Sequence, residues 1–219
     1  MNLKVFCILL FCLNPVFINI STGQRIYPEA TLVYDVSVQR EDSSARSGLE
    51  GASLTIYLKA FESRSDFKSA AGTESVLFDN KKGKGAILKE YSGQKLMITL
   101  TRENREKQLS YFTSLNFIED SSRSSIGGFP VRLATAALPD NRKLLVYYSP
   151  GVIMQNAHYQ FAFSSLKGLA VRFELVSGKE TYVYQLRSIS GEPLNPSLFV
   201  IPQNGFRIIT YEENLALKN

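Results

Sequence analysis

The chain has 219 residues, of which 44% are hydrophobic and 21% charged, a balance that suits a sizeable folded core and argues against intrinsic disorder for most of the sequence. The formal net charge is +5, but the lysines and arginines are scattered, whereas nucleic-acid-binding proteins usually concentrate them on one surface. Nucleic acid is therefore not an expected partner.

Residues 1–23 have the pattern of a secretory signal peptide. Lys4 precedes an apolar run at residues 5–20, and small polar residues follow it. The run is short for a membrane-spanning helix, and Asn14 and Pro15 interrupt it. We predict cleavage near Gly23 and a single domain over residues 24–219; an uncleaved membrane anchor is the second interpretation.

The exported chain offers little material for catalysis. Cys7 and Cys12 both lie in the predicted signal peptide, so the remainder has no thiol nucleophile, disulfide or cysteine metal ligand. His158 is the one histidine, and neither a G-x-S-x-G stretch nor a phosphate-binding G-x-x-x-x-G-K-[ST] pattern occurs. We expect no enzyme activity, no cofactor and no metal, although a converging pair of carboxylates stays open.

Alternating apolar and polar residues predict a series of β-strands after the signal peptide. The segments with this pattern are 31–39, 53–61, 74–79, 85–91, 94–101, 131–138, 144–149, 170–176 and 181–189. Turns recur about every 8–12 residues, which is typical of an antiparallel sandwich, barrel or curved sheet. The fold class that we predict is mainly β with a few helices.

Turn and helix signals fall between these strands. Residues 80–84, which include three lysines and a glycine, predict a solvated hairpin turn. Residues 139–141 predict another turn, because Pro, Asp and Asn favour turns. Residues 101–112 predict a surface helix with Thr101 as N-cap, but Asn104 in place of Glu or Gln leaves the capping box incomplete. Residues 160–168 predict a helical turn, and residues 121–128 a mobile linker.

Two sets of side chains are candidates for binding. Arg64 and Asp66 share a strand face, so they are expected either to bind a ligand head group or to bind each other. Nine apolar residues form a candidate binding face for a hydrophobic ligand: Leu54, Ile56, Leu58, Leu96, Ile98, Leu100, Tyr182, Tyr184 and Leu186. Segments 111–117 and 161–169 are expected to act as lids that cover this face partly or completely.

The segments YLKAFESRSDFKS, VLFDNKKGKGAILKEYSGQKLMITLTREN, IGGFPVRLA, LVYYSP, LKGLAVRFEL and FVIPQNGF carry a family resemblance. In their order they resemble a secreted Bacteroidetes-type family of unknown function, which is similar in fold to the periplasmic lipoprotein carrier LolA. The resemblance covers roughly residues 30–211. It implies a curved antiparallel sheet, an incomplete barrel, with helices on the concave side, in the periplasm or on the outer surface of a Gram-negative bacterium.

Three functions follow from these features. The first is a binding protein for an acyl chain, a lipid or a lipoprotein. The second is a non-enzymatic structural or assembly partner of the cell envelope, and the third is a hydrolase with carboxylate chemistry. A fully packed concave face favours the second over the first, and converging carboxylates in a cleft favour the third.

Overall fold

The computed structural model describes residues 23–40, 51–113, 115–138, 143–159, 163, 165–177 and 180–217. The strands are β1 (Arg25–Tyr27), β2 (Glu29–Arg40), β3 (Ser53–Lys59), β4 (Glu62–Ser69), β5 (Gly72–Asp79), β6 (Lys84–Tyr91), β7 (Gln94–Thr101), β8 (Ile118–Ile126), β9 (Phe129–Ala137), β10 (Lys143–Ser149), β11 (Val152–Met154), β12 (Leu169–Ser177), β13 (Glu180–Ser190) and β14 (Arg207–Ile209). Helices α1 (Arg102–Thr113) and α2 (Tyr211–Ala216) and 3₁₀ turns at Ala157–Tyr159 and Pro196–Phe199 complete the described elements.

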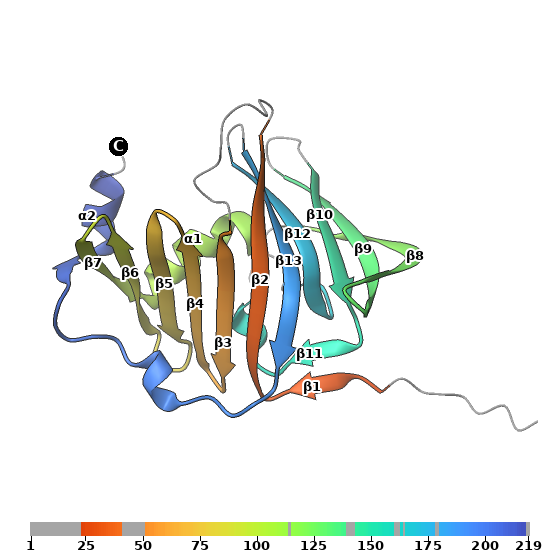
Figure 1. Ribbon diagram of the computed structural model, residues 1–219, viewed down its shortest axis with the longest axis horizontal. Coiled ribbons are helices and arrows are strands. Elements are labelled where there is room, and N and C mark those ends of the chain that lie inside the picture. The colour runs from red at the N-terminus through yellow and green to blue at the C-terminus, as the bar shows by residue number, and fades with distance from the viewer. Residues whose placement is uncertain are drawn as a thin grey trace, which may run out of the picture.

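A single 12-stranded sheet dominates the molecule, in the order β14-β7-β6-β5-β4-β3-β2-β13-β12-β10-β9-β8. Neighbouring strands are antiparallel except β14 and β7, which are parallel. The sheet is strongly curved but does not close into a barrel (Figure 1). Strands β1 and β11 form a separate parallel pair at one end of it. The predicted fold class, a mainly β, curved antiparallel sheet, is confirmed.

The cross-strand register assigns the residues of the sheet to two faces. Tyr34 lies opposite both Leu186 and Leu54, and Ile87 lies opposite Ile98. Because side chains alternate along each strand, such pairings carry one face across the sheet from β13 to β7. We call this the inner face. It holds all nine residues predicted to share a face: Leu54, Ile56, Leu58, Leu96, Ile98, Leu100, Tyr182, Tyr184 and Leu186.

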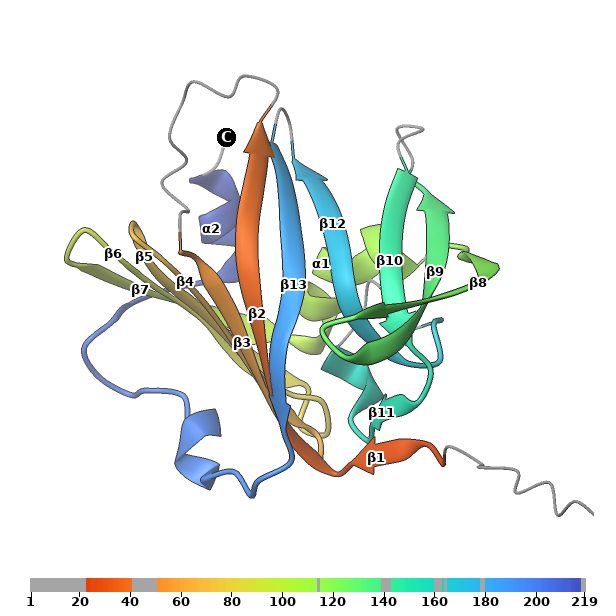
Figure 2. The ribbon, with the colours of Figure 1, turned by 45° about the vertical axis from the view of Figure 1, so that its right-hand side comes forward.

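Two hydrophobic clusters lie on the inner face. The main core contains residues of β2, β3, β9, β10, β12 and β13. Leu115, Phe163 and Leu166, which lie outside the strands, also belong to it. The edge core lies at the other end, where Tyr211 of α2 packs on Ile98 of β7. Helix α1 joins the two ends of the sheet and lies within its curve (Figure 2). Both predicted lid segments therefore contribute buried side chains.

The opposite, outer face is covered by residues 191–206, which we call the C-terminal strap. This segment leaves β13, passes in front of the lower ends of β3–β6 and returns to β14 at the edge of the sheet (Figure 1). Ile201 and Phe206 of the strap pack on a third hydrophobic cluster, formed by Leu77, Ala86, Leu88 and Met97. The outer face is thus partly closed by the chain itself.

The structure corrects the prediction made for residues 121–128. Residues 121–128, predicted to be a mobile linker, form most of strand β8 and the turn into β9. The strand lies at the edge of the sheet and is exposed along almost its whole length, so neither of its faces has to be apolar. Its pairing with β9 orders it, and a polar sequence without alternation gives no sign of such pairing.

Other local predictions agree with the structure where it describes them. The helix predicted at residues 101–112 is α1. Residues 139–142 lie outside the described part of the chain, but β9 and β10 pair as the two strands of the predicted hairpin, with Ala137 opposite Lys143. The predicted signal peptide, the side chain of His158 and most of segment 160–164 also lie outside the described residues. The domain boundary near residue 23 stays a prediction.

Candidate functional site

The nine predicted residues divide into two groups by exposure. Leu58, Ile98, Leu100 and Leu186 are at most 3% exposed and belong to the hydrophobic cores. The other five are half-buried: Leu54, Ile56, Leu96, Tyr182 and Tyr184. Only this second group keeps surface that a ligand could contact. The sequence predicted the shared face, whereas the burial of each side chain depends on what covers it.

The half-buried apolar surface is centred on strands β3, β4 and β5. Phe67 lies directly opposite Leu54 in the β3–β4 pair, and Val76 follows Ile56 two strands along. We call Leu54, Ile56, Phe67 and Val76 the apolar strip. Val76 lies in a run of three apolar residues, which does not show from the sequence which of them share a face, and Phe67 lies among polar residues and gives no signal at all.

Helix α1 runs behind β5, β4 and β3 in the view of Figure 1, on the side of the strip. The side chain of Arg105 approaches the inner face, and its guanidinium carbon lies 5.9 Å from the centre of the Phe78 ring. Its Nη1 donates a 3.3 Å hydrogen bond to Gln108 Oε1. Removal from water lowers the pKa of Arg105 to about 10. At neutral pH the helix therefore places a desolvated positive charge above the sheet.

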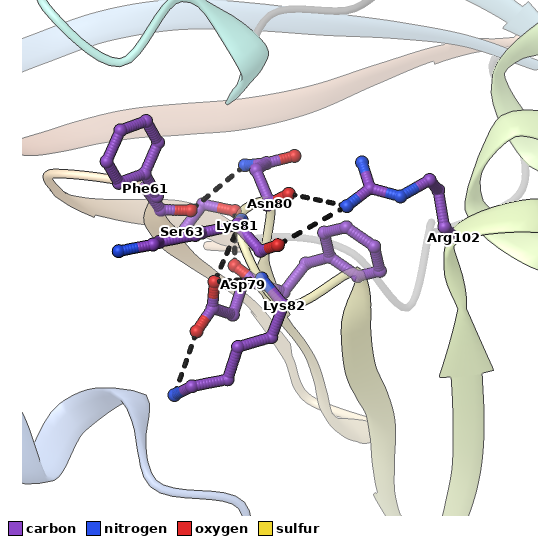
Figure 3. Close-up of polar contacts among 8 residues, drawn as sticks. Phe61, Ser63, Asp79, Asn80, Lys81, Lys82 and Arg102 are labelled. Carbon is purple, nitrogen blue, oxygen red and sulfur yellow. Dashed lines mark hydrogen bonds and ion pairs between the residues drawn. The ribbon is translucent and has the colours of Figure 1, made fainter.

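The start of α1 is held in place by polar contacts with the β5–β6 turn. Arg102 Nη2 donates to the carbonyl oxygens of Asn80 and Lys81, at 3.0 and 3.5 Å (Figure 3). Asp79 Oδ1 accepts the backbone N–H groups of Lys81 and Lys82, each at 2.9 Å, which closes the turn. Gly83 in this turn has φ +67°, and an added Cβ would lie 2.9 Å from the Arg102 guanidinium. The predicted basic turn is thus a docking point for the helix.

An ion pair interrupts the apolar inner face. Lys89 Nζ lies 3.5 Å from Glu74 Oε2, and both side chains keep partial exposure. Glu74 lies opposite Phe67, so the pair borders the apolar strip on its β6 side. The inner face therefore combines apolar side chains with two places, Arg105 and Lys89, at which a charged group of a ligand could be bound.

Arg64 and Asp66 lie on the outer face, away from the apolar residues. Arg64 Nε donates to Asp66 Oδ1 at 2.8 Å, and Arg64 Nη1 donates to the carbonyl oxygen of Leu198 in the C-terminal strap at 3.0 Å. Asp66 is only 6% exposed. Of the two expectations for this pair, the structure shows the mutual contact. The pair cannot serve a head group on the inner face, because the sheet lies between them.

A series of aromatic rings links the inner face to a cavity. Tyr184 stacks on Phe173 with ring centres 4.7 Å apart, and Phe173 contacts Phe163 at the same distance. Phe163 also lines a cavity with a volume of about 340 Å³, together with apolar side chains of β11 and the neighbouring 3₁₀ turn. Burial raises the pKa of Tyr184 to about 12. The predicted residue Tyr184 thus lies two rings away from this cavity.

The cavity beside Phe163 is mainly apolar. Its lining consists of Gln24, Ile153, Met154, Ala157, Tyr159, Phe163, Leu166, Lys167 and Gly168. Among the described residues of this lining, Lys167 is the one that is basic, and it is exposed. Such a composition suits an apolar chain with a polar end rather than a strongly polar ligand.

Two further findings concern only the described residues. Within the described ranges, no three His, Cys, Asp or Glu side chains gather closely enough to hold a metal ion. None of the helices in that part of the chain is both long and apolar enough to span a membrane.

Comparisons with known proteins find no matching protein-family model and no matching curated protein. Solved structures do match. The chain is 12% identical to PNGF-II over 87% of its own length and 32% of that chain, with a TM-score of 0.48. For a chain of the Pseudomonas aeruginosa MucA/MucB complex the identity is 12%, the coverage 79% and 56%, and the TM-score 0.39. For LprF from Mycobacterium bovis these values are 10%, 76% and 87%, and 0.34.

The chain therefore spans about a third of the PNGF-II chain and just over half of the MucA/MucB chain. At these identities, function has to be inferred from the residues of this chain itself.

Proposed function

We propose that the protein is an extracytoplasmic binding protein for a hydrophobic ligand, such as an acyl chain, a lipid or a lipoprotein. The observation that carries the proposal is the half-buried apolar strip on the concave face. Helix α1, on the same side of the sheet, packs Phe112 against the main core and brings the Arg105 guanidinium to 5.9 Å from the Phe78 ring. An apolar chain placed on the strip would gain about 0.8 kcal/mol for each methylene removed from water.

Arg105 gives the proposed ligand an orientation. Its desolvated guanidinium would bind a carboxylate or phosphate more strongly than a cation in open water would, because the local dielectric constant is lower. The apolar strip would then hold the tail. We propose an ionised acyl chain, lying with its charged end toward α1, as the simplest ligand of this kind.

The location and the absence of catalysis belong to the same proposal. The sequence pattern of residues 1–23 supports export, and the resemblance to the LolA-like family supports a periplasmic or outer-surface location. A non-enzymatic role is supported by Glu74, the carboxylate beside the apolar strip, because it is paired with Lys89.

Binding of a fluorescent fatty acid to the purified protein tests the proposal. Ile56→Asp places a carboxylate on the apolar strip and should abolish saturable binding in the folded variant. Thr99→Asp is the control, since Thr99 is exposed on the outer face of β7 opposite Ala86, and this variant should bind as wild type does. Ile98→Asp is unsuitable, because Ile98 is fully buried and the variant would not fold.

A second pair of variants tests the role of Arg105. Arg105→Met should weaken binding of the ionised fatty acid by about tenfold and leave binding of its methyl ester unchanged. Lys107→Met, on the exposed side of α1, is the control with the same charge change. If wild-type protein shows no saturable binding of either probe, the carrier proposal is wrong.

In that case the alternative is a structural or assembly partner of the cell envelope. The specific observation in its favour is the main core, where Leu115, Phe163 and Leu166 already close the inner face over β2 and its neighbours. Under this alternative the strip is simply the rim of a packed core, and Ile56→Asp would affect stability alone.

A further inference from the structure

Two arginines of the strands β8 and β9 lie directly opposite each other. Arg123 pairs with Arg132 across the antiparallel β8–β9 hairpin, just after a register irregularity in β8. Side chains in such a pair start about 5 Å apart, and like charges in this position destabilise a sheet. A negative charge bound between the two guanidinium groups would relieve this repulsion.

The carboxylate nearby compensates only part of this charge. Glu119 Oε2 accepts a 2.5 Å hydrogen bond from the Tyr148 hydroxyl and lies 3.9 Å from Arg132 Nη1, which is beyond hydrogen-bond distance. Asp120 binds the backbone N–H of Ser122 within the irregular part of β8. Within the described ranges of the chain, Arg123 has neither an ion-pair nor a hydrogen-bond partner.

Both arginines line the same cavity, which has a volume of about 420 Å³. Residues of the β8–β9 hairpin, of the turn from β10 to β11 and of the segment before β1 line the cavity. Phe129, Val131 and Val152 form apolar parts of its wall. A cross-strand arginine pair at the side of a partly apolar cavity is an arrangement for binding an anion that carries an apolar group.

We propose that this cavity is a binding site for a phosphate monoester. One arginine can satisfy both oxygens of a carboxylate through its paired N–H groups, so a carboxylate does not need two arginines. A phosphate monoester carries up to two negative charges and three terminal oxygens, which is enough for both guanidinium groups. The proposal is independent of the carrier function, because the cavity residues are distinct from the apolar strip and from Arg105.

Isothermal titration calorimetry with hexyl phosphate, inorganic phosphate and hexanoate, at constant ionic strength, tests the site. Hexyl phosphate should bind most tightly, since the other two probes lack either the apolar group or the second charge. Arg123→Gln should weaken its binding by about tenfold or more, the effect expected for the loss of charge-assisted hydrogen bonds. Arg207→Gln, an exposed arginine on β14 at the opposite edge of the sheet, is the matched control and should bind as wild type does.

The variant Arg123→Glu separates binding from folding. It places opposite charges across the β8–β9 pair, so its melting temperature without phosphate should equal or exceed that of wild type. Added hexyl phosphate should raise the melting temperature of wild type but not of this variant. Equal binding by wild type and Arg123→Gln, or stronger binding of hexanoate than of hexyl phosphate, would overturn the proposal.

A final arm distinguishes a soluble monoester from a lipid head group. Vesicles of phosphatidylcholine with phosphatidic acid are sedimented with wild type and with Arg123→Gln. Co-sedimentation that depends on Arg123 identifies the lipid phosphate as a ligand of the site. Binding of hexyl phosphate without co-sedimentation identifies a soluble monoester, and the absence of both contradicts the site.

Discussion

Thr101 and Asn104 cap the start of helix α1 by hydrogen-bonding each other's backbone. The Asn104 N–H donates to Thr101 Oγ1, and the Thr101 N–H donates to Asn104 Oδ1, both at 3.1 Å. This is the reciprocal pattern of a capping box, with Asn in the place of Glu or Gln. The prediction of an incomplete box was therefore wrong, because the Asn104 side chain reaches the Thr101 N–H as Glu or Gln would. Asn104 Nδ2 also donates to Glu212 Oε1 of α2 at 3.1 Å, so the cap joins the two helices.

Replacing Asn104 by Ala should therefore destabilise the protein. We expect a loss of about 1 kcal/mol in the free energy of unfolding, the usual cost of a lost cap, measured by urea denaturation. Thr101→Ser keeps the hydroxyl and should behave as wild type does. An Asn104→Ala variant with unchanged stability would show that the cap contributes nothing.

Arg64→Met should destabilise the outer face. It leaves the Asp66 carboxylate, which is 6% exposed, without its partner, and it removes the hydrogen bond to Leu198 in the strap. Breaking one side of a buried ion pair costs about 3 kcal/mol or more, and the partial exposure of Arg64 places this case at the lower end.

The double variant Arg64→Met/Asp66→Leu is the control for this effect. It removes both charges together, so it should unfold at a higher urea concentration than Arg64→Met alone. Hydrogen exchange of the strap amides should be faster than in wild type in both variants, because both lose the bond to Leu198. If the double variant is the less stable of the two, the ion pair is not what stabilises this region.

Gly85 on β6 has no room for a side chain. A Cβ there would lie 2.2 Å from the carbonyl oxygen of Leu77 and 2.5 Å from the Phe78 ring. Gly85→Ala should cost about 1–3 kcal/mol, because the β5–β6 pair must shift to admit the methyl group. Gly151→Ala is the matched control: a Cβ at Gly151 meets nothing within 4 Å, and thermal unfolding of that variant should resemble wild type.

Alkaline pH should weaken the stacked aromatic pair of the main core. Burial raises the pKa of Tyr184 from 10.0 to about 12, so between these values the folded state keeps a proton that the unfolded state releases. Stability then falls as the pH rises through this window, and the contribution is fully present below pH 10.

Tyr184→Phe isolates the effect of this hydroxyl. Phe cannot ionise and keeps the ring that stacks on Phe173 at 4.7 Å. In parallel urea titrations, the variant should lose less stability than wild type as the pH rises from 10.0 to about 12. Identical pH dependence in the two proteins would mean that Tyr184 titrates alike in the folded and unfolded states.

The sequence by itself determined the mainly β fold and the membership of the inner face. Leu54, Ile56 and Leu58 are each two residues apart, and side chains with this spacing lie on the same face of a strand in any sheet. The antiparallel register then adds Leu96, Ile98 and Leu100 to the same face, as predicted. Helix α1 was also predictable from Thr101 as its N-cap, whereas the part of Asn104 in the cap was not predicted.

Tertiary structure alone decided what each face does. Arg64 and Asp66 fall on the outer face because β3 and β4 are joined at Ala60 and Phe61, and Ala60 adopts φ 48° without the glycine that would reveal such a turn. Strand β8 exists because β9 offers it hydrogen bonds. The exposure of the apolar strip, the desolvation of Arg105 and the Arg123–Arg132 pair all arise between segments far apart in the chain or across a register irregularity, and local sequence patterns carry no information about such contacts.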